Sequence, residues 1–400
     1  MTQYSVFDSE KALNYVASLA PLFNLQAPLN CYEFGDGNLN LVFRVSDSTG
    51  RSIILKQALP YARCVGESWP LTLDRARIEA SVLKLHGVIC PETTVKVLHQ
   101  NNQLALTILE DLGQLAILRT ALNNSETFPK LSKDIATHLA TTSFNYSDFV
   151  LTPAQKKSLV SEFLNPELCA ITEELFFDDP YHQHERNNFP ITLTERVNAL
   201  RSNTHLRLEV AKLKAKFLSS PQTLLHGDVH TGSIFVDANT TKVIDPEFGF
   251  FGPIGFDLGS FVGNLLLNYC AQQARIESLP QRRQMQTYLI SCIAECLLTF
   301  EQSWKDLANA HSLDVTLRDP VYIEYFVGSI IQDAVGYCGT ELIRRTIGLA
   351  HVADIDNIED EQARLAVAQH TLFIGEQLIL NSSGCTSQKQ TMQLLLSLLN

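Results

Sequence analysis

The chain has 400 residues, 45% of them hydrophobic and 18% charged, which is enough apolar material for a large buried core. Its 43 acidic and 31 basic residues give a net charge of −12, which opposes nonspecific binding to nucleic acid. No apolar run reaches the ~18 residues that span a bilayer, and the first residues lack a secretion signal. The nine cysteines are scattered without a Cys-x-x-Cys pair, as is typical of free thiols. We therefore expect a globular, cytoplasmic protein with no nucleic-acid or membrane partner.

The first part of the chain combines a helix with a strand pair. Residues 8–20 have helical spacing behind a capping residue, either Asp8 or Ser9. Two β-rich runs, residues 40–46 and 51–57, flank the turn-forming sequence Asp-Ser-Thr-Gly and predict a hairpin.

A helix and a second hairpin follow. Residues 70–87 have the spacing of an amphipathic helix, which we expect Gly87 to close. Residues 93–111 predict two strands that turn at Asn101 and Asn102. Together these elements predict a small antiparallel sheet with one inserted helix.

The pattern becomes helical from about residue 114 and is interrupted only by short apolar runs around residues 223–250. We therefore expect an α+β fold with two lobes. The N-terminal lobe, residues 1–112, would contain the sheet and bind a nucleotide, and the helical lobe, residues 113–400, would carry the catalytic loop, the metal site and the substrate site. The tight connection at residues 110–113 favours a cleft between them.

Carboxylates gather between residues 224 and 250. Asp228 precedes one strand-like run, and Asp245 and Glu247 follow the next. Two short paired strands would therefore bring these acids together at one end of the pair. Carboxylates held together are costly without a compensating cation, and an oxygen-rich pair suits Mg²⁺ better than zinc. Phosphoryl transfer uses such a metal together with an acceptor for the proton of the substrate hydroxyl.

The N-terminal part supplies the other components of phosphoryl transfer. Gly35 and Gly37 lie at a turn between strands, where the absence of Cβ atoms allows phosphates to approach the backbone. Lys56 ends a strand, and Glu79 follows on the next helix, an order that suits a fixed ion pair. Backbone groups of residues 110–112 could bind an adenine edge. The order of these parts matches that of a kinase.

Other polar or reactive residues have simpler interpretations. His226 and His230 are as compatible with a structural role, in which they fix the loop backbone, as with a role in the site. The stretch around His182 and His184 resembles a metal-binding cluster but reads as a polar loop, so we expect no zinc site there. Cysteines 292 and 296 have helical spacing and are predicted to pack, and the apolar C-terminal segment predicts a docking helix.

Three segments carry a close family resemblance: "LLHGDVHTGSI" at residues 224–234, "VIDPEFGFFGPIGFDLGSFVGNLLL" at 243–267 and "ELIRRTIGLAHVADI" at 341–355. They resemble the 5-methylthioribose kinase family, whose fold is protein-kinase-like and is shared with aminoglycoside and choline kinases. The resemblance extends from about residue 30 to residue 358. It implies ATP- and Mg²⁺-dependent phosphorylation of the 1-hydroxyl of S-methyl-5-thioribose in methionine salvage, and a homodimer.

The resemblance also implies a role for each matching residue. Asn40 replaces the third glycine of the general kinase loop, Ser233 stands near the position of the usual metal-binding Asn, and Asp245-Pro246-Glu247 replaces Asp-Phe-Gly. Mapped onto this sequence, the implied catalytic residue is Asp228; the implied nucleotide contacts are Gly35, Gly37, Asn40, Lys56, Glu79, Glu110, Asp111, Leu112, Asp245, Pro246 and Glu247; the implied metal ligands are Asp245, Glu247 and Ser233; and the implied sugar contacts are Asp228, Trp69, Arg344 and Arg345.

Two alternatives stay open at this level. The first is another small-molecule kinase of the same fold, acting on choline, homoserine or an aminoglycoside. Arginine at the acceptor site argues against a cationic acceptor, which would call for an acidic or aromatic enclosure. The second is a catalytically silent nucleotide-binding regulator, although such a protein has no reason to keep the complete set of charged residues.

Overall fold

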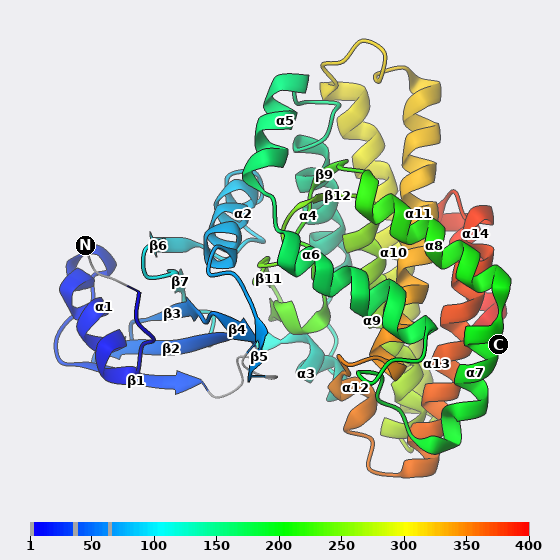
Figure 1. The fold of residues 1–400 in the computed structure, drawn as a ribbon, viewed down its shortest axis with the longest axis horizontal. Helices are drawn as coiled ribbons and strands as arrows, with labels where there is room; N and C mark the ends of the chain where they lie inside the picture. The colour runs from blue at the N-terminus through cyan, green and yellow to red at the C-terminus, as the bar shows by residue number, and fades with distance from the viewer. Residues whose placement is uncertain (1–3, 35–38, 63–65, 400) are drawn as a thin grey trace.

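The computed structural model describes residues 4–34, 39–62 and 66–399. A five-stranded antiparallel sheet with strand order β1-β2-β3-β7-β6 forms the N-terminal part, at the left of Figure 1. The elements of this part are α1 (Ser9–Phe23), β1 (Leu29–Phe34), β2 (Asn40–Asp47), β3 (Ser52–Ala58), the short pair β4 (Tyr61–Ala62) and β5 (Gly66–Pro70), α2 (Arg75–Ile89), β6 (Val97–Asn101) and β7 (Leu106–Glu110).

Alternating apolar side chains explain why a helix covers each face of this sheet. Ile53 and Leu55 of β3 point into the cluster that contains Val16 of α1, whereas Ile54 between them packs with Leu83 of α2. Lys56 therefore shares its face of β3 with Ile54 and points toward α2. The sheet thus delivers the lysine to the side on which the helical part lies.

The predicted hairpins and helices of this part are confirmed, with differences at element ends, among them that the helix predicted from residue 70 begins at Arg75. Asp8 caps α1 by accepting from the backbone N of Lys11, and β2 pairs with β3 across the predicted turn. Helix α2, however, continues through Gly87 to Ile89. It ends there because a residue that precedes a proline, here Cys90, is disfavoured in helical conformation. The second hairpin turns over residues 102–105 and not at Asn101.

The remainder of the chain is mostly helical and fills the right of Figure 1. Its helices are α3 (Leu118–Asn123), α4 (Leu131–Asn145), α5 (Pro153–Glu162), α6 (Pro166–Thr172), α7 (Thr194–Ser202), α8 (Thr204–Ser219), α9 (Gly255–Arg275), α10 (Leu279–His311), α11 (Pro320–Ile347), α12 (Ala353–Asp356), α13 (Glu361–Asn381) and α14 (Gln388–Leu399), and single turns lie at Glu173–Asp178, Asp179–Tyr181, Ile191–Leu193, Thr231–Ser233 and Ser382–Gly384.

Short strands interrupt the helices, and all but the first of them lie around residues 223–250, where the sequence predicts them. These strands are β8 (Ala116–Ile117), β9 (Thr223–Leu224), β10 (Ile234–Val236), β11 (Thr241–Val243) and β12 (Phe251–Gly252). Strand β10 pairs with β11, as expected, and also with β8, a two-residue strand too short to leave a sequence pattern. The β10–β11 hairpin lies directly after the loop that carries Asp228.

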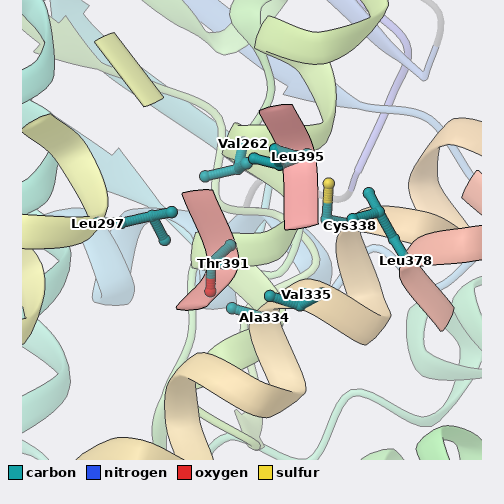
Figure 2. A pocket seen from close by; sticks show the side chains of 8 residues that line it. All are labelled: Val262, Leu297, Ala334, Val335, Cys338, Leu378, Thr391 and Leu395. Atoms are coloured by element: carbon teal, nitrogen blue, oxygen red, sulfur yellow. The ribbon is translucent and has the colours of Figure 1, made fainter. Parts of the chain in front are cut away.

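Helices α9 and α11 pack against each other at the centre of the helical part, and α13 covers α11. Leu395 and Thr391 of α14 close a void of only about 10 Å³ against Val262 and Cys338 (Figure 2). A void of this size is at most one water molecule wide, so the interior here is closely packed core and not a ligand site. The predicted C-terminal docking helix and the packing of Cys292 and Cys296 are confirmed.

No helix among the described residues combines the length and the apolar character that crossing a bilayer requires. The longest, α10, carries polar and charged residues along its 33 residues. This agrees with the absence of a long apolar run in the sequence.

Candidate active site

The loop that carries Asp228 is held by hydrogen bonds on both sides. The backbone N atoms of His226 and Gly227 donate to the Asp257 carboxylate at 2.8 and 3.0 Å, which fastens the loop to the start of α9. His226 Nε2 donates to the carbonyl of Ile244 at 2.8 Å, so this imidazole fixes the loop to the end of the β10–β11 hairpin. The neighbouring residue Asp228 is thereby held in a defined position.

Gly227 is required in this loop for two reasons. Its φ of 85° lies in the left-handed region that favours glycine. A Cβ at this position would also lie 2.2 Å from the carbonyl oxygen of Phe248, closer than real contacts allow. The loop can therefore approach the segment that follows Asp245 only because residue 227 has no side chain.

A histidine and two arginines surround the Asp228 carboxylate. His230 Nε2 lies 3.4 Å from one oxygen, and the guanidinium groups of Arg344 and Arg345 lie 3.5 and 3.6 Å from the other. Burial opposes ionisation of Asp228, but His230, Arg345 and Arg344 outweigh it and lower its pKa well below the ordinary value. Its side chain keeps 28% exposure. The carboxylate is therefore charged and accessible, which is what accepting a hydrogen bond from a hydroxyl group requires.

Lys56 joins the sheet to the helical part. Its Nζ lies 2.9 Å from Glu79 Oε1 on α2 and also contacts Asp245 Oδ1. Burial opposes a charged lysine, but Asp245 and Glu79 reverse that effect and raise the pKa of Lys56. Burial raises the pKa of Glu79 to about 7, against the opposing influence of Lys56. The expected Lys56–Glu79 pair is present, and Asp245 is its third member.

Glu247 is bound by two polar side chains from the N-terminal part. Asn40 Nδ2 donates to Glu247 Oε2 at 3.0 Å, and Arg75 Nε donates to the same oxygen at 3.2 Å. Arg75 also donates to Asn40 Oδ1 at 3.0 Å, which closes a ring of three side chains. Burial and then Asp245 raise the pKa of Glu247. Arg75 was not among the predicted site residues, because nothing in its local pattern distinguishes it from Arg77 nearby.

The acidic pair Asp245 and Glu247 fits a divalent cation. Asp245 adopts a φ of 71° and exposes 39% of its side chain, while the Glu247 side chain is 6% exposed. The residues that the structure describes contain no group of three or more His, Cys, Asp or Glu side chains arranged to hold a metal ion. Mg²⁺ needs no such group, since it typically takes one or two carboxylates together with substrate phosphates and water. A bound cation would relieve the rise in the pKa of Glu247 that burial and the neighbouring Asp245 carboxylate cause.

Ser233 is occupied within its own loop. Its hydroxyl donates to the carbonyl of His230 at 2.9 Å and accepts from the backbone N of His230 at 3.1 Å. These bonds stabilise the turn after Asp228. The predicted metal role of Ser233 is untested, and the hydrogen bonds give its hydroxyl a structural function.

Asp228 opens into a cavity of about 570 Å³, within the range that holds small molecules. One end is charged, with Asp228, Arg344 and Arg345. The rest is mostly apolar or aromatic, and Thr172, Asn188, His230, His351 and Asp356 add polar groups to it. The other lining residues that matter to its shape are Leu39, Trp69, Ile171, Leu175, Phe176, Phe248 and Leu349.

Two cation–π contacts order the aromatic side chains of this cavity. The Arg344 guanidinium lies 3.6 Å from the centre of the Phe176 ring, and the Arg186 guanidinium lies 5.3 Å from the Trp69 ring. Arg186 is itself fixed by Asp179, whose oxygens accept from it at 2.7 and 2.9 Å. Arg186 was not among the predicted site residues, because its charged neighbours in the sequence indicate only a polar loop.

Residues 110–113, which we call the strap, connect the sheet to the helices. Their predicted role involves only backbone groups, but two of their side chains also form hydrogen bonds. Glu110 ends β7, and its carboxylate accepts from the backbone N of Lys96 at 2.8 Å. Asp111 accepts from Ser52 at 2.6 Å and from Arg44, so its side chain belongs to the sheet. Nucleotide contact by Glu110, Asp111 and Leu112 stays a prediction about their backbone. Gly35 and Gly37 lie outside the described residues.

Comparisons with known proteins identify the family of this chain. The family model for the phosphotransferase enzyme family matches residues 31–286. The methylthioribose kinase of Yersinia enterocolitica is 49% identical over 390 residues, covering 97% of each chain, and that of Pectobacterium carotovorum is 48% identical, covering 95% of each. Among solved structures, a choline kinase from Cryptosporidium parvum matches over 98% of this chain and 100% of its own, at 14% identity and a TM-score of 0.49. The chain belongs to the phosphotransferase enzyme family and, within it, to the methylthioribose kinases.

Proposed function

We propose that the protein transfers the γ-phosphoryl group of ATP to the 1-hydroxyl of S-methyl-5-thioribose, with Mg²⁺, in methionine salvage. One observation carries this proposal: an ionised, accessible carboxylate, Asp228, faces two arginines in a cavity whose other lining residues are mostly apolar or aromatic. A sugar with a methylthio group has the same division into a polar and an apolar end. A cationic acceptor such as choline would meet the arginine pair unfavourably.

In this proposal Asp228 accepts a hydrogen bond from the 1-hydroxyl and aligns it for attack. Its lowered pKa makes it a weak base. Its contribution is therefore mainly orientation, as in other phosphoryl transfers, where positioning and charge neutralisation dominate. Arg344 and Arg345 would stabilise negative charge on the transferred group, which a planar guanidinium binds through two parallel hydrogen bonds.

The nucleotide would bind beside this cavity. Leu39 and Phe248 line its edge, and they adjoin Asn40 and Glu247 in the chain. Mg²⁺ held by Asp245 and Glu247 would neutralise phosphate charge. Lys56, released from Asp245, would bind phosphate oxygens while Glu79 keeps it in place. The proposed division into residues 1–112 and 113–400 puts the nucleotide between the two lobes, with the strap residues Glu110 to Leu112 at the adenine.

Two further features belong to the same proposal. We place the protein in the cytoplasm, which is supported by the free thiols of its eight described cysteines, since reducing compartments keep thiols unpaired. We also propose a homodimer, which light scattering behind a sizing column tests directly: a mass near twice 44.7 kDa supports it, and a mass of one chain rejects it.

The deciding experiment measures ADP release by the pure protein with Mg·ATP and one acceptor at a time. The acceptors are methylthioribose, ribose, choline and homoserine, and ³¹P NMR identifies the product. We expect rapid turnover with methylthioribose and a 1-phosphate product. Preferred turnover of choline or homoserine would reject the sugar assignment, and a thermal shift with Mg·ATP but no phosphorylated product would indicate a silent nucleotide binder.

A further inference from the structure

A buried glutamate lies behind the two arginines of the cavity. Glu341 is fully buried on α11, one turn before Arg344 and Arg345. One of its oxygens accepts from Arg344 Nε, and the other accepts from Arg345 Nε at 2.9 Å. The two arginines therefore share a single carboxylate, with one oxygen for each.

The opposite ends of the guanidinium groups point toward Asp228 without reaching it. The Nη2 atoms of Arg344 and Arg345 lie 3.5 and 3.6 Å from Asp228 Oδ1. Hydrogen bonds between charged groups are shorter, at about 2.7–2.9 Å. The arginines are thus close enough to keep Asp228 ionised but too far to take its lone pairs.

Glu341 is in turn fixed from behind. Asn264 Nδ2 on α9 donates to Glu341 Oε1 at 2.8 Å, and Arg119 donates to Asn264 Oδ1 at 2.7 Å. Burial opposes ionisation of Glu341, but Arg344 and Arg345 lower its pKa, so it stays charged. Glu341 and Asn264 are buried, and the partly buried Arg119 braces them from the far side.

We propose that Glu341 is a positioning residue: by holding the Nε atoms of Arg344 and Arg345 it keeps both guanidinium groups back from Asp228, so that this carboxylate is free for the acceptor hydroxyl. The inference rests on the proposed function. Without the anchor, an arginine would move the remaining distance and form a direct hydrogen-bonded pair with Asp228. The acceptor hydroxyl would then compete with that arginine for the same oxygen.

The Glu341→Gln substitution tests this idea with almost no change in size. An amide has one acceptor oxygen, so it can hold one arginine, and its NH₂ group faces the other as donor against donor. We expect kcat/KM for methylthioribose to fall by about tenfold or more, as when one buried charged group loses its partner. We expect the dissociation constant of Mg·ADP, measured by calorimetry, to change by less than about twofold.

The matched control is Glu376→Gln on α13. Glu376 is a buried glutamate with a similar environment, since it accepts from Arg196 at 2.5 Å and from Asn203 at 3.0 Å, but it does not line the cavity. This control reports the cost of losing a buried ion pair elsewhere. Equal effects of the two substitutions on sugar kinetics would overturn the proposal.

A double-mutant cycle with Arg345→Lys separates positioning from a purely structural role. If Glu341 acts through the arginines, the losses in kcat/KM from Glu341→Gln and Arg345→Lys will combine to less than their product, whereas independent effects multiply. Multiplicative losses would overturn the proposal.

If Glu341→Gln fails to fold, the milder substitution Asn264→Ala removes one hydrogen bond to Glu341. We expect it to reduce kcat/KM for the sugar by a few-fold and to leave nucleotide binding intact. An unchanged kcat/KM would overturn the proposal. Should the unmodified protein not phosphorylate methylthioribose, the proposed function itself fails, and the same variants are then compared on the acceptor that is turned over.

Discussion

The two ends of the cleft differ in how their charges are balanced. At the nucleotide end, three carboxylates face two cationic side chains. The carboxylates are those of Glu79, Asp245 and Glu247, and the cations are Lys56 and Arg75. At the sugar end, two carboxylates face two arginines; they are Asp228, Glu341, Arg344 and Arg345. The excess of negative charge at the first end leaves room for a cation, while the balanced second end keeps a single carboxylate ionised and accessible. Charge placement therefore divides the proposed work between metal binding and acceptor alignment.

The largest expected effect comes from removing the charge of Asp228. Asp228→Asn should reduce turnover by about 10²–10⁴-fold, because the acceptor hydroxyl loses the group that orients it. Nucleotide affinity should be nearly unchanged, since Asp228 belongs to the other end of the cleft. Steady-state kinetics and ADP titration measure both quantities. Asp237→Asn, in the exposed turn of the β10–β11 hairpin, is the control. Retained turnover in Asp228→Asn would contradict the assigned role.

Asp245→Asn should act at the nucleotide end. We expect kcat/KM for Mg·ATP to fall by about 10²-fold, because an electrostatic group that contacts the phosphate region is lost. The Mg²⁺ concentration for half-maximal activity should rise as well. Asp333→Asn serves as the control, because it breaks a Lys–Asp pair with Lys216 away from the cavity. An unchanged Mg²⁺ requirement would show that Asp245 is not a metal ligand.

The two ends should also differ in their dependence on pH. The pKa of Glu79 is raised by burial to about 7, so this residue is protonated below that pH and then cannot hold Lys56 as an ion pair. The Asp228 pKa is lowered, so Asp228 stays ionised throughout. We therefore expect kcat/KM for ATP to fall as pH decreases through about 7, since this quantity reports the groups of the free enzyme.

Glu79→Gln identifies the group responsible. Above pH 7 the variant should have a lower kcat/KM for ATP than the parent, and its profile should be flat where that of the parent falls, so that the two converge at low pH. The same downward limb in both proteins would assign the titration to another group.

The smallest expected effect concerns the contact between Arg186 and Trp69. Arg186→Lys keeps the charge but loses the planar stacking, which is worth about 0.5–1 kcal/mol and corresponds to a rise of roughly 2–5-fold in KM for the sugar. The control is Arg201→Lys, because Arg201 lies 5.6 Å from the Phe189 ring outside the cavity. Equal sugar kinetics in both variants would show that Trp69 needs no support from Arg186.

Local patterns were enough to predict much of the fold. The β-rich run that contains Lys56 was enough to predict a strand with this lysine near its end. The predicted end of α2 was wrong by two residues, because Pro91 ends this helix more effectively than Gly87 does. Strand β8 was missed because two residues cannot show a period.

At the site, the sequence by itself indicated the residues whose chemistry is unusual for their surroundings, such as Asp228 and Asp245 among apolar neighbours. Glu341 could have been found too, since it lies three and four residues before the two arginines and a helix brings such positions together. Arg75 and Arg186 could not have been found from the sequence. Their partners Glu247 and Trp69 are more than a hundred residues away in the chain, and only the packing of the sheet against the helices brings them into contact. The sequence thus determined which groups are available, whereas the tertiary structure decided which charges share a partner, because ion pairs between distant segments depend on where the backbone places both ends.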